Sequence, residues 1–104
     1  MKPVRIQRKR TKGWNAHEAA GNGLPIAYVH RPLKWGNPFV FPRGNKVAQE
    51  RAVHCFETAL RGGRLSFNCE EVRRELKGRN LGCFCRLEDP CHADVLLAIA
   101  NEVD

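Results

Sequence analysis

Four residues near the C-terminus have side chains that bind metals or act as nucleophiles: Cys83, Cys85, Cys91 and His92. Three thiols and one imidazole match the ligand types of a tetrahedral zinc site. The spacing is unusual, because one residue separates Cys83 from Cys85 and none separates Cys91 from His92. On a straight strand the first two thiols lie too far apart to share a metal, so the strand must curl at its end. The cofactor predicted on these grounds is Zn²⁺.

The same side chains support two other interpretations. Asp89 and Pro90 are typical of a helix start, which places Cys91 and His92 in the first turn of that helix. Free backbone N–H groups and the helix dipole favour negative charge there, which predicts a lowered pKa for the Cys91 thiol. Cys91 and His92 are then catalytic candidates, one as nucleophile and the other as proton carrier. The alternative is that the thiols are small buried core residues.

A second group of candidates combines cations with aromatic and amide side chains in two segments. Cations bind phosphate, tryptophan offers a face on which a base stacks, and asparagine reads a base edge. The predicted ligand is a nucleotide or a nucleic acid. The alternative is that both tryptophans are core residues. The candidate ligand-binding residues are Arg8, Lys9, Arg10, Lys12 and Trp14 in the first segment, and Arg31, Lys34, Trp35 and Asn37 in the second.

The net charge of +7 also points to an anionic ligand. Residues 1–36 contain eight lysines and arginines against one acid, Glu18, and so carry the whole excess. The remaining residues contain ten bases and ten acids. A basic region of this kind indicates a localised anion-binding surface, although a solvated basic tail would have the same composition.

Length and composition bound the class of protein. The 104 residues are predicted to form a single domain, 1–104. No apolar run is long enough for a membrane span, and the basic N-terminus lacks the apolar stretch of a secretory signal, so the expected location is cytoplasmic. Five cysteines, an odd number, argue against a disulfide framework. Cys55 and Cys69 stand alone and are predicted to be ordinary thiols.

The elements that must position these candidates follow from periodicity and capping residues. Alternating or short apolar runs predict strands at 4–8, 26–30 and 81–85, whereas residues 16–23 are ambiguous. Helices are predicted at 45–60, after Asn68 up to Gly78, and from Asp89 onward. The apolar stripe expected on the last helix is Val95, Leu96, Ile99, Ala100 and Val103.

This order predicts an α/β fold with a small, open, mainly parallel sheet of three or four strands flanked by helices. Ligands of such sheets bind beyond the carboxyl ends of the strands. The loops 8–14, 34–39 and 85–92 each follow a predicted strand region. If the strands are parallel, the three loops and their candidate residues lie along one edge of the sheet.

Three blocks of the chain, RIQRKRTKGW at 5–14, KWGNPF at 34–39 and the cysteine block with PCHADVLL at 90–97, resemble a small family of phage and bacterial proteins. That family is known as a domain of unknown function, so the resemblance implies an origin in phage or in their bacterial hosts and no mechanism. His30 stands where family members often have glycine, and Phe84 where tryptophan is frequent. Neither difference affects a candidate ligand.

Three classes of function remain open. The first is a binding protein or enzyme directed at nucleotides; if it is an enzyme, transfer or hydrolysis at a phosphate or glycosidic bond suits a phage setting. The second is a non-catalytic module in which zinc stabilises the fold and the basic region grips a nucleic-acid backbone. The third is an inhibitor that binds a protein partner.

Overall fold

The computed structural model describes residues 2–42 and 44–102. Its three strands are β1 (Arg5–Gln7), β2 (Ile26–Tyr28) and β3 (Asn80–Cys83). Both neighbouring pairs are parallel and the order is β1-β3-β2, so the last strand of the chain lies in the middle. The predicted α/β class with an open, parallel sheet of three or four strands is confirmed.

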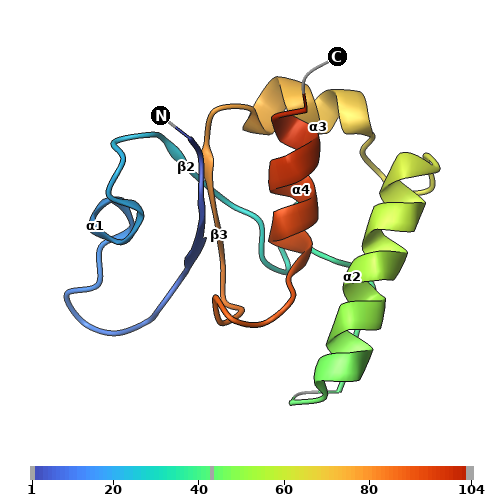
Figure 1. Cartoon of the computed structure of the whole chain (residues 1–104), viewed down its shortest axis with the longest axis horizontal. Coiled ribbons are helices and arrows are strands. Elements are labelled where there is room, and N and C mark those ends of the chain that lie inside the picture. Colours follow the sequence, from blue (N-terminus) through green and yellow to red (C-terminus); the bar gives the residue numbers. More distant parts are fainter. Residues whose placement is uncertain (1, 43, 103–104) are drawn as a thin grey trace.

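Four helices surround this sheet: α1 (Ala16–Ala20), α2 (Lys46–Arg61), α3 (Cys69–Leu76) and α4 (His92–Ala100). Helix α4 contacts β3 and β1, and it also contacts α3 and α2. It therefore lies between α2 and the strands (Figure 1). Helix α1 lies beside β1 at the opposite side of the molecule (Figure 1). None of the helices in residues 2–42 and 44–102 has both the length and the apolar character needed to cross a membrane.

Asparagines begin three of the helices. The Oδ1 atom of Asn15 accepts hydrogen bonds from the backbone N–H groups of His17 and Glu18, which starts α1 inside the segment left ambiguous by periodicity. Asn45 caps α2 through Ala48 N, and Asn68 caps α3 through Glu71 N, as predicted. These caps satisfy N–H groups that a helix cannot bond internally.

Helix α4 starts later than predicted. Its first residue is His92 and its cap is Cys91, which has an extended backbone and makes no side-chain capping bond. Asp89 is therefore not the cap; its carboxylate lies 3.5 Å from the ammonium group of Lys46. Val95, Leu96, Ile99 and Ala100 are buried as predicted, and Val103 lies outside the described residues.

The core lies where α4 packs on the sheet and receives α2 and α3. Its fully buried side chains include Val29 from the sheet region, Phe56 and Leu60 of α2, and Leu96 and Ile99 of α4. In the middle of β3, a Cβ atom on Gly82 would lie 2.7 Å from the Tyr28 ring, so only glycine allows the tyrosine to cover the central strand.

Candidate metal centre and adjoining pocket

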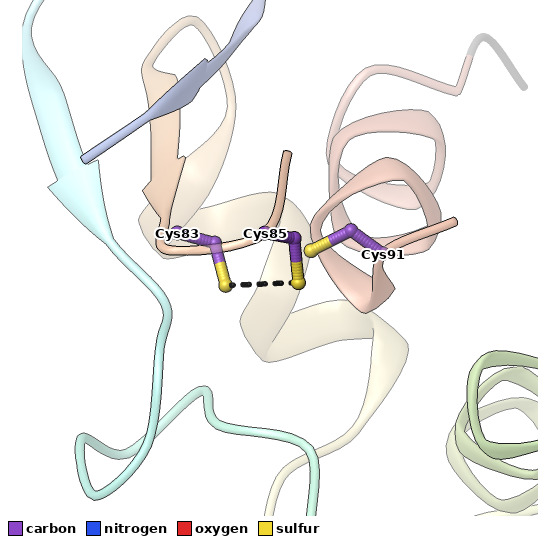
Figure 2. Close-up of side chains that lie close together, drawn as sticks. All are labelled: Cys83, Cys85 and Cys91. Carbon is purple, nitrogen blue, oxygen red and sulfur yellow. Dashed lines mark hydrogen bonds between the residues drawn. The ribbon is translucent and has the colours of Figure 1, made fainter. Parts of the chain in front are cut away.

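Three cysteines gather at the carboxyl end of the central strand. Strand β3 ends at Cys83, the chain bends through Phe84 and Cys85, and Cys91 lies just before α4. Their sulfur atoms all lie within 4.8 Å of one another, and the sulfurs of Cys83 and Cys85 are 3.8 Å apart. Figure 2 shows the Cys91 sulfur directed toward the other two. The chain thus curls at the end of the strand, as it must if Cys83 and Cys85 are to share a metal.

The distances suit a tetrahedral metal. Bonds of about 2.3 Å from zinc to sulfur place two tetrahedral sulfur ligands about 3.8 Å apart. The observed separation between Cys83 and Cys85 has this value. Three nearby cysteines can therefore hold a metal ion without a large movement of the backbone.

The thiols also influence one another's ionisation. Hydrogen bonds from the Cys85 and Cys91 thiols lower the pKa of Cys83, because they stabilise its thiolate. Hydrogen bonding to Cys83 raises the pKa of Cys85 to about 11, and it also raises the pKa of Cys91. The lowered pKa of Cys91 expected at a helix start is thus wrong, since its two thiol neighbours and its burial keep the proton on it. A cation is needed before all three can be thiolates.

His92 is close to the cluster but is not part of the group of three ligand atoms. Its ring is buried against Phe56, and its Nε2 atom donates a 2.7 Å hydrogen bond to the carbonyl oxygen of Val29. Its Nδ1 atom lies 3.8 Å from the Cys91 sulfur. Burial lowers the pKa of His92, which keeps the imidazole neutral. The structure groups three of the four predicted ligands, Cys83, Cys85 and Cys91, and His92 links α4 to the end of the β2 region.

A pocket of about 260 Å³ adjoins the three thiols. Its walls combine apolar surfaces with a few polar groups, and all three cysteines contribute to it. Besides these, it is lined by His30, Arg31, Asn37, Phe41, Gln49, Val53, Phe84, Pro90 and His92. The pocket lies beyond the carboxyl ends of parallel strands, where ligands of open α/β sheets are expected.

A second cavity, of about 600 Å³, continues from the first. The two share Arg31, Phe41, Gln49, Phe84 and Cys85, so they adjoin one another. We call the one lined by the three cysteines the inner compartment and the one lined by the exposed cations the outer compartment. The outer compartment adds the cations Lys46 and Arg86 and the carboxylate of Asp89. Arg31 was among the predicted ligand-binding residues, but Lys46 and Arg86 were not. The predicted cations came from segments that also contain tryptophan, and these two do not lie in such a segment.

Gln49 joins α2 to the cysteine loop. It is 7% exposed, and its Nε2 atom donates a 2.7 Å hydrogen bond to the carbonyl oxygen of Pro90. The same atom lies 3.8 Å from the Cys85 sulfur. A glutamine on the same helix face as Ala52, Val53 and Phe56 was the sequence signal for this contact.

Arg5 holds the loop that joins Cys85 to Cys91. Its Nη2 atom donates to the carbonyl oxygens of Leu87 and Asp89 at 2.6 and 3.1 Å, and its Nε atom lies 3.3 Å from the carboxylate of Asp94. The side chain is 8% exposed. The sequence showed only a cation in an alternating strand, so this positioning residue was missed.

Arg8 and Arg10 lie on aromatic rings beside the pocket. The Arg8 guanidinium lies 4.3 Å from the ring centre of Tyr28, and that of Arg10 lies 4.7 Å from the ring centre of Phe84. Arg8 Nη1 also donates to His30 Nε2 at 2.7 Å, so the proton of the neutral imidazole is on Nδ1, which bonds to the carbonyl oxygen of Arg31. Both guanidinium groups thus contact the ring of Phe84, the residue between Cys83 and Cys85.

The other predicted contacts of the first basic loop lie farther out. Lys9 and Lys12 are exposed, and Trp14 is half-buried. Trp14 lines a separate hollow of about 160 Å³ with Arg5, Lys9 and Leu87, rather than the pocket beside the cysteines. The loop thus contributes its first two arginines to the neighbourhood of the pocket and turns its tip away.

The segment 34–37 packs inward. Trp35 is buried against Phe67, with ring centres 4.7 Å apart, and Lys34 forms ion pairs with Glu71 and Glu75 of α3. Trp35 is therefore a core residue with no open face for a base, which corrects its predicted stacking. Asn37 does line the pocket, but its amide donates to the Ala52 carbonyl and accepts from Phe39 N, so it positions the segment rather than reading a base.

Gly36 in this segment brings two backbones together. A Cβ atom at this position would lie 2.8 Å from Arg31 Cγ and 3.0 Å from Arg31 Cα. The glycine therefore allows the segment to fold against Arg31 and leaves the arginine at the pocket.

A comparison with family models agrees with the resemblance to a domain of unknown function. No curated protein and no solved structure matches the chain. Residues 6–102 match the family described as Domain of unknown function (DUF4326), which is nearly the whole chain. The chain therefore belongs to this family, Domain of unknown function (DUF4326).

Proposed function

We propose that this protein holds a zinc ion on Cys83, Cys85 and Cys91 and binds a nucleotide in the adjoining pocket. The observation that carries the proposal is the shared lining: the three thiols face a compartment whose outer part contains Arg31, Lys46 and Arg86. A soft metal and an anionic ligand thus have adjacent places at one edge of the sheet.

Zinc is favoured by the donor atoms. Thiolates select soft or borderline metals such as zinc over magnesium or calcium, which prefer oxygen. The separation of 3.8 Å between the Cys83 and Cys85 sulfurs suits bonds of zinc length. A divalent cation would also offset the repulsion that keeps protons on Cys85 and Cys91.

A nucleotide is favoured by the division of the pocket. The inner compartment has the apolar walls Phe41, Val53, Phe84 and Pro90, which suit a flat base. The outer compartment has three cations, which suit phosphate oxygens. Arg8 and Arg10 add positive charge behind Phe84.

Native mass spectrometry of the reduced protein is the first test. We expect one zinc ion per chain, released on denaturation. The zinc-loaded protein is then heated with each of the four ribonucleoside monophosphates and, separately, with the matching nucleosides. At least one nucleotide should raise the melting temperature saturably and more than its nucleoside does, because the outer cations bind the phosphate.

A matched pair of variants localises the phosphate. Lys46→Gln removes a cation of the outer compartment, whereas Arg51→Gln removes one from the same helix that lines neither compartment. We expect the first to weaken nucleotide binding about threefold and the second to leave it unchanged, since one exposed charge contributes under about 1 kcal/mol. Equal effects of the two variants, or no nucleotide binding by the wild type, would refute the nucleotide part of the proposal.

One observation favours the alternative, a zinc-stabilised module that binds nucleic-acid backbone. Lys9, Arg10 and Lys12 are exposed on the loop after β1, and no ion pair forms to them within residues 2–42 and 44–102. Such a module would bind DNA or RNA with an affinity that falls steeply with salt and ignores base identity. Base-dependent binding of mononucleotides by the same preparation would favour the pocket instead.

A further inference from the structure

We infer that a metal on the three cysteines keeps its fourth coordination position open toward the inner compartment, where the bound small molecule fills it. This inference rests on the proposed metal site and specifies how the ligand would bind there. Zinc sites that only stabilise a fold have four protein ligands, whereas sites that act on a ligand keep one position for it.

The protein supplies three ligand atoms and no fourth in the same group. The sulfurs of Cys83, Cys85 and Cys91 are the only His, Cys, Asp or Glu ligand atoms that come together in a cluster of three or more within the described chain. His92 is the nearest alternative, because its Nδ1 atom lies 3.8 Å from the Cys91 sulfur. It lies outside the group of ligand atoms within 4.8 Å of one another, and its ring is held in place by the Val29 carbonyl and Phe56.

The surroundings of the thiols indicate where the open position lies. All three cysteines line the inner compartment, and Cys83 and Cys91 are otherwise buried. The compartment faces them with Phe41, Val53, Phe84 and Pro90, whose side chains have no metal-binding atom. Its polar side chains are engaged elsewhere: Gln49 donates to the Pro90 carbonyl, His30 bonds to Arg8 and to the Arg31 carbonyl, and His92 lies outside the group of three sulfurs. The fourth donor on this side is then water or a bound molecule.

The shape of the site then sets the orientation of a nucleotide. A base presents ring nitrogens, which are good zinc ligands, on a flat group that suits the apolar inner walls. Its phosphate would extend to Arg31, Lys46 and Arg86 in the outer compartment. The reverse orientation would place the phosphate among aromatic rings and away from Lys46 and Arg86, the cations that line the outer compartment alone. The ligand class is thus a nucleoside monophosphate bound with its base toward the metal.

The test uses the full chain reconstituted with cobalt(II) without oxygen, because cobalt replaces zinc and its visible spectrum reports coordination. We expect one cobalt per chain with strong thiolate-to-metal absorption. Imidazole, a small neutral nitrogen donor, should then shift the d–d bands saturably. Adenosine monophosphate should shift them in the same direction and bind about fivefold more tightly than adenosine, through its phosphate.

Two variants of α2 locate the open position. Val53→Trp adds an indole to the wall of the inner compartment, whereas Val47→Trp adds it on a residue that is 64% exposed on the same helix. Both should bind one cobalt. We expect Val53→Trp to bind imidazole at least tenfold more weakly than the wild type, and Val47→Trp to bind it with the wild-type affinity. A full response in Val53→Trp would show that the open position faces elsewhere and would overturn the inference.

X-ray absorption at the zinc edge of the wild type provides a measurement that needs no variant. Three sulfurs and one oxygen or nitrogen without the scattering pattern of imidazole are expected in the ligand-free protein. An imidazole pattern together with an unresponsive cobalt spectrum would identify His92 as a fourth ligand, and the inference would be wrong while the metal site stands. If neither zinc nor cobalt binds stoichiometrically, the proposed function fails as well.

Discussion

The two edges of the sheet use polar side chains in opposite ways. At the amino edge, Asn80 is fully buried and its amide is bonded on both sides. At the carboxyl edge, three thiols lie close together, and three basic side chains line the adjoining pocket. The strands are parallel, so the same topology collects side chains at both edges. The difference lies in whether the protein satisfies those side chains itself.

The amino edge is a closed network. Asn80 Oδ1 accepts from Val4 N at 3.0 Å and from the Asn22 amide at 2.9 Å, while Asn80 Nδ2 donates to Asn22 Oδ1 at 2.7 Å. Asn22 also donates to the carbonyl oxygen of Lys2 and accepts from Leu24 N. A network satisfied in this way stabilises the fold and has no group left for a ligand.

The carboxyl edge is held in place by groups that surround it. Arg5 bonds to the carbonyls of the loop 86–89, and Gln49 bonds to Pro90, so the thiols are positioned from β1 and from α2. The thiols themselves raise one another's pKa, apart from Cys83, whose pKa is lowered. An edge with fixed supports and unsatisfied central groups is typical of a binding site. Four substitutions test this comparison.

The largest effect is expected from Cys91→Ser at the carboxyl edge. We expect zinc affinity to fall by more than about a hundredfold, since loss of a mere supporting contact in metal sites already costs ten- to a hundredfold. Competition with a chelator measures it. Cys55→Ser and Cys69→Ser remove thiols outside the cluster and should leave the affinity unchanged. Wild-type affinity in Cys91→Ser would show that the cluster is not a metal centre.

Asn80→Ala should affect the other edge alone. It removes the partner of the Val4 N–H and one partner of the Asn22 amide at a partly buried place, so the free energy of unfolding should fall by about 2 kcal/mol. Urea unfolding of the zinc-saturated protein measures this change. The zinc stoichiometry of the folded variant should stay the same. Loss of metal from folded Asn80→Ala would mean that the two edges are coupled and would break the comparison.

Arg5→Gln tests the support of the carboxyl edge. The loop 86–89 loses the guanidinium that bonds its carbonyls, so we expect zinc affinity about tenfold lower. The cobalt spectrum of the loaded variant should retain its thiolate bands, because the ligands themselves are unchanged. Arg79→Gln, at an exposed arginine just before β3, is the control with the same charge change. Equal zinc affinities in the two variants would show that Arg5 does not support the metal centre.

The smallest effect is expected from Gly36→Ala. The added Cβ lies too close to Arg31 Cγ and Cα, so the arginine must move from the pocket. We expect nucleotide binding to weaken about threefold, the contribution of one exposed charge, with zinc affinity unchanged. Calorimetric titration of the zinc-loaded protein gives both values. A loss of zinc affinity in this variant would extend the metal centre to the segment 34–37.

Local patterns were sufficient for most elements. Asn45 and Asn68 identified the starts of α2 and α3, and alternating or short apolar runs identified the three strands, because capping and pleating depend on neighbouring residues. The start of α4 was predicted too early. Asp89 is a residue type that often caps helices, but its carboxylate pairs with Lys46 instead. Helix α1 was left open because only five residues form it.

The three cysteines of the candidate site were recognised from their residue types, but the surrounding residues were not. Lys46, Gln49 and Phe84 reach the pocket from α2 and from the bend after β3, and Arg5 reaches its loop from β1. Trp35 was assigned to the ligand although it packs on Phe67. Nothing in the local sequence distinguishes a tryptophan that faces solvent from one that packs on a phenylalanine thirty residues later in the chain.

The sequence by itself determined the parallel α/β fold and the residue types gathered beyond the strands, because periodicity, caps and strand order are properties of the linear chain. Only the tertiary structure decided which of those residues meet. The bend after Cys83 brings its sulfur to 3.8 Å from that of Cys85, and the burial of His92 against Phe56 separates it from the group of three. Distances of a few ångströms decide metal coordination, and they depend on how distant elements pack.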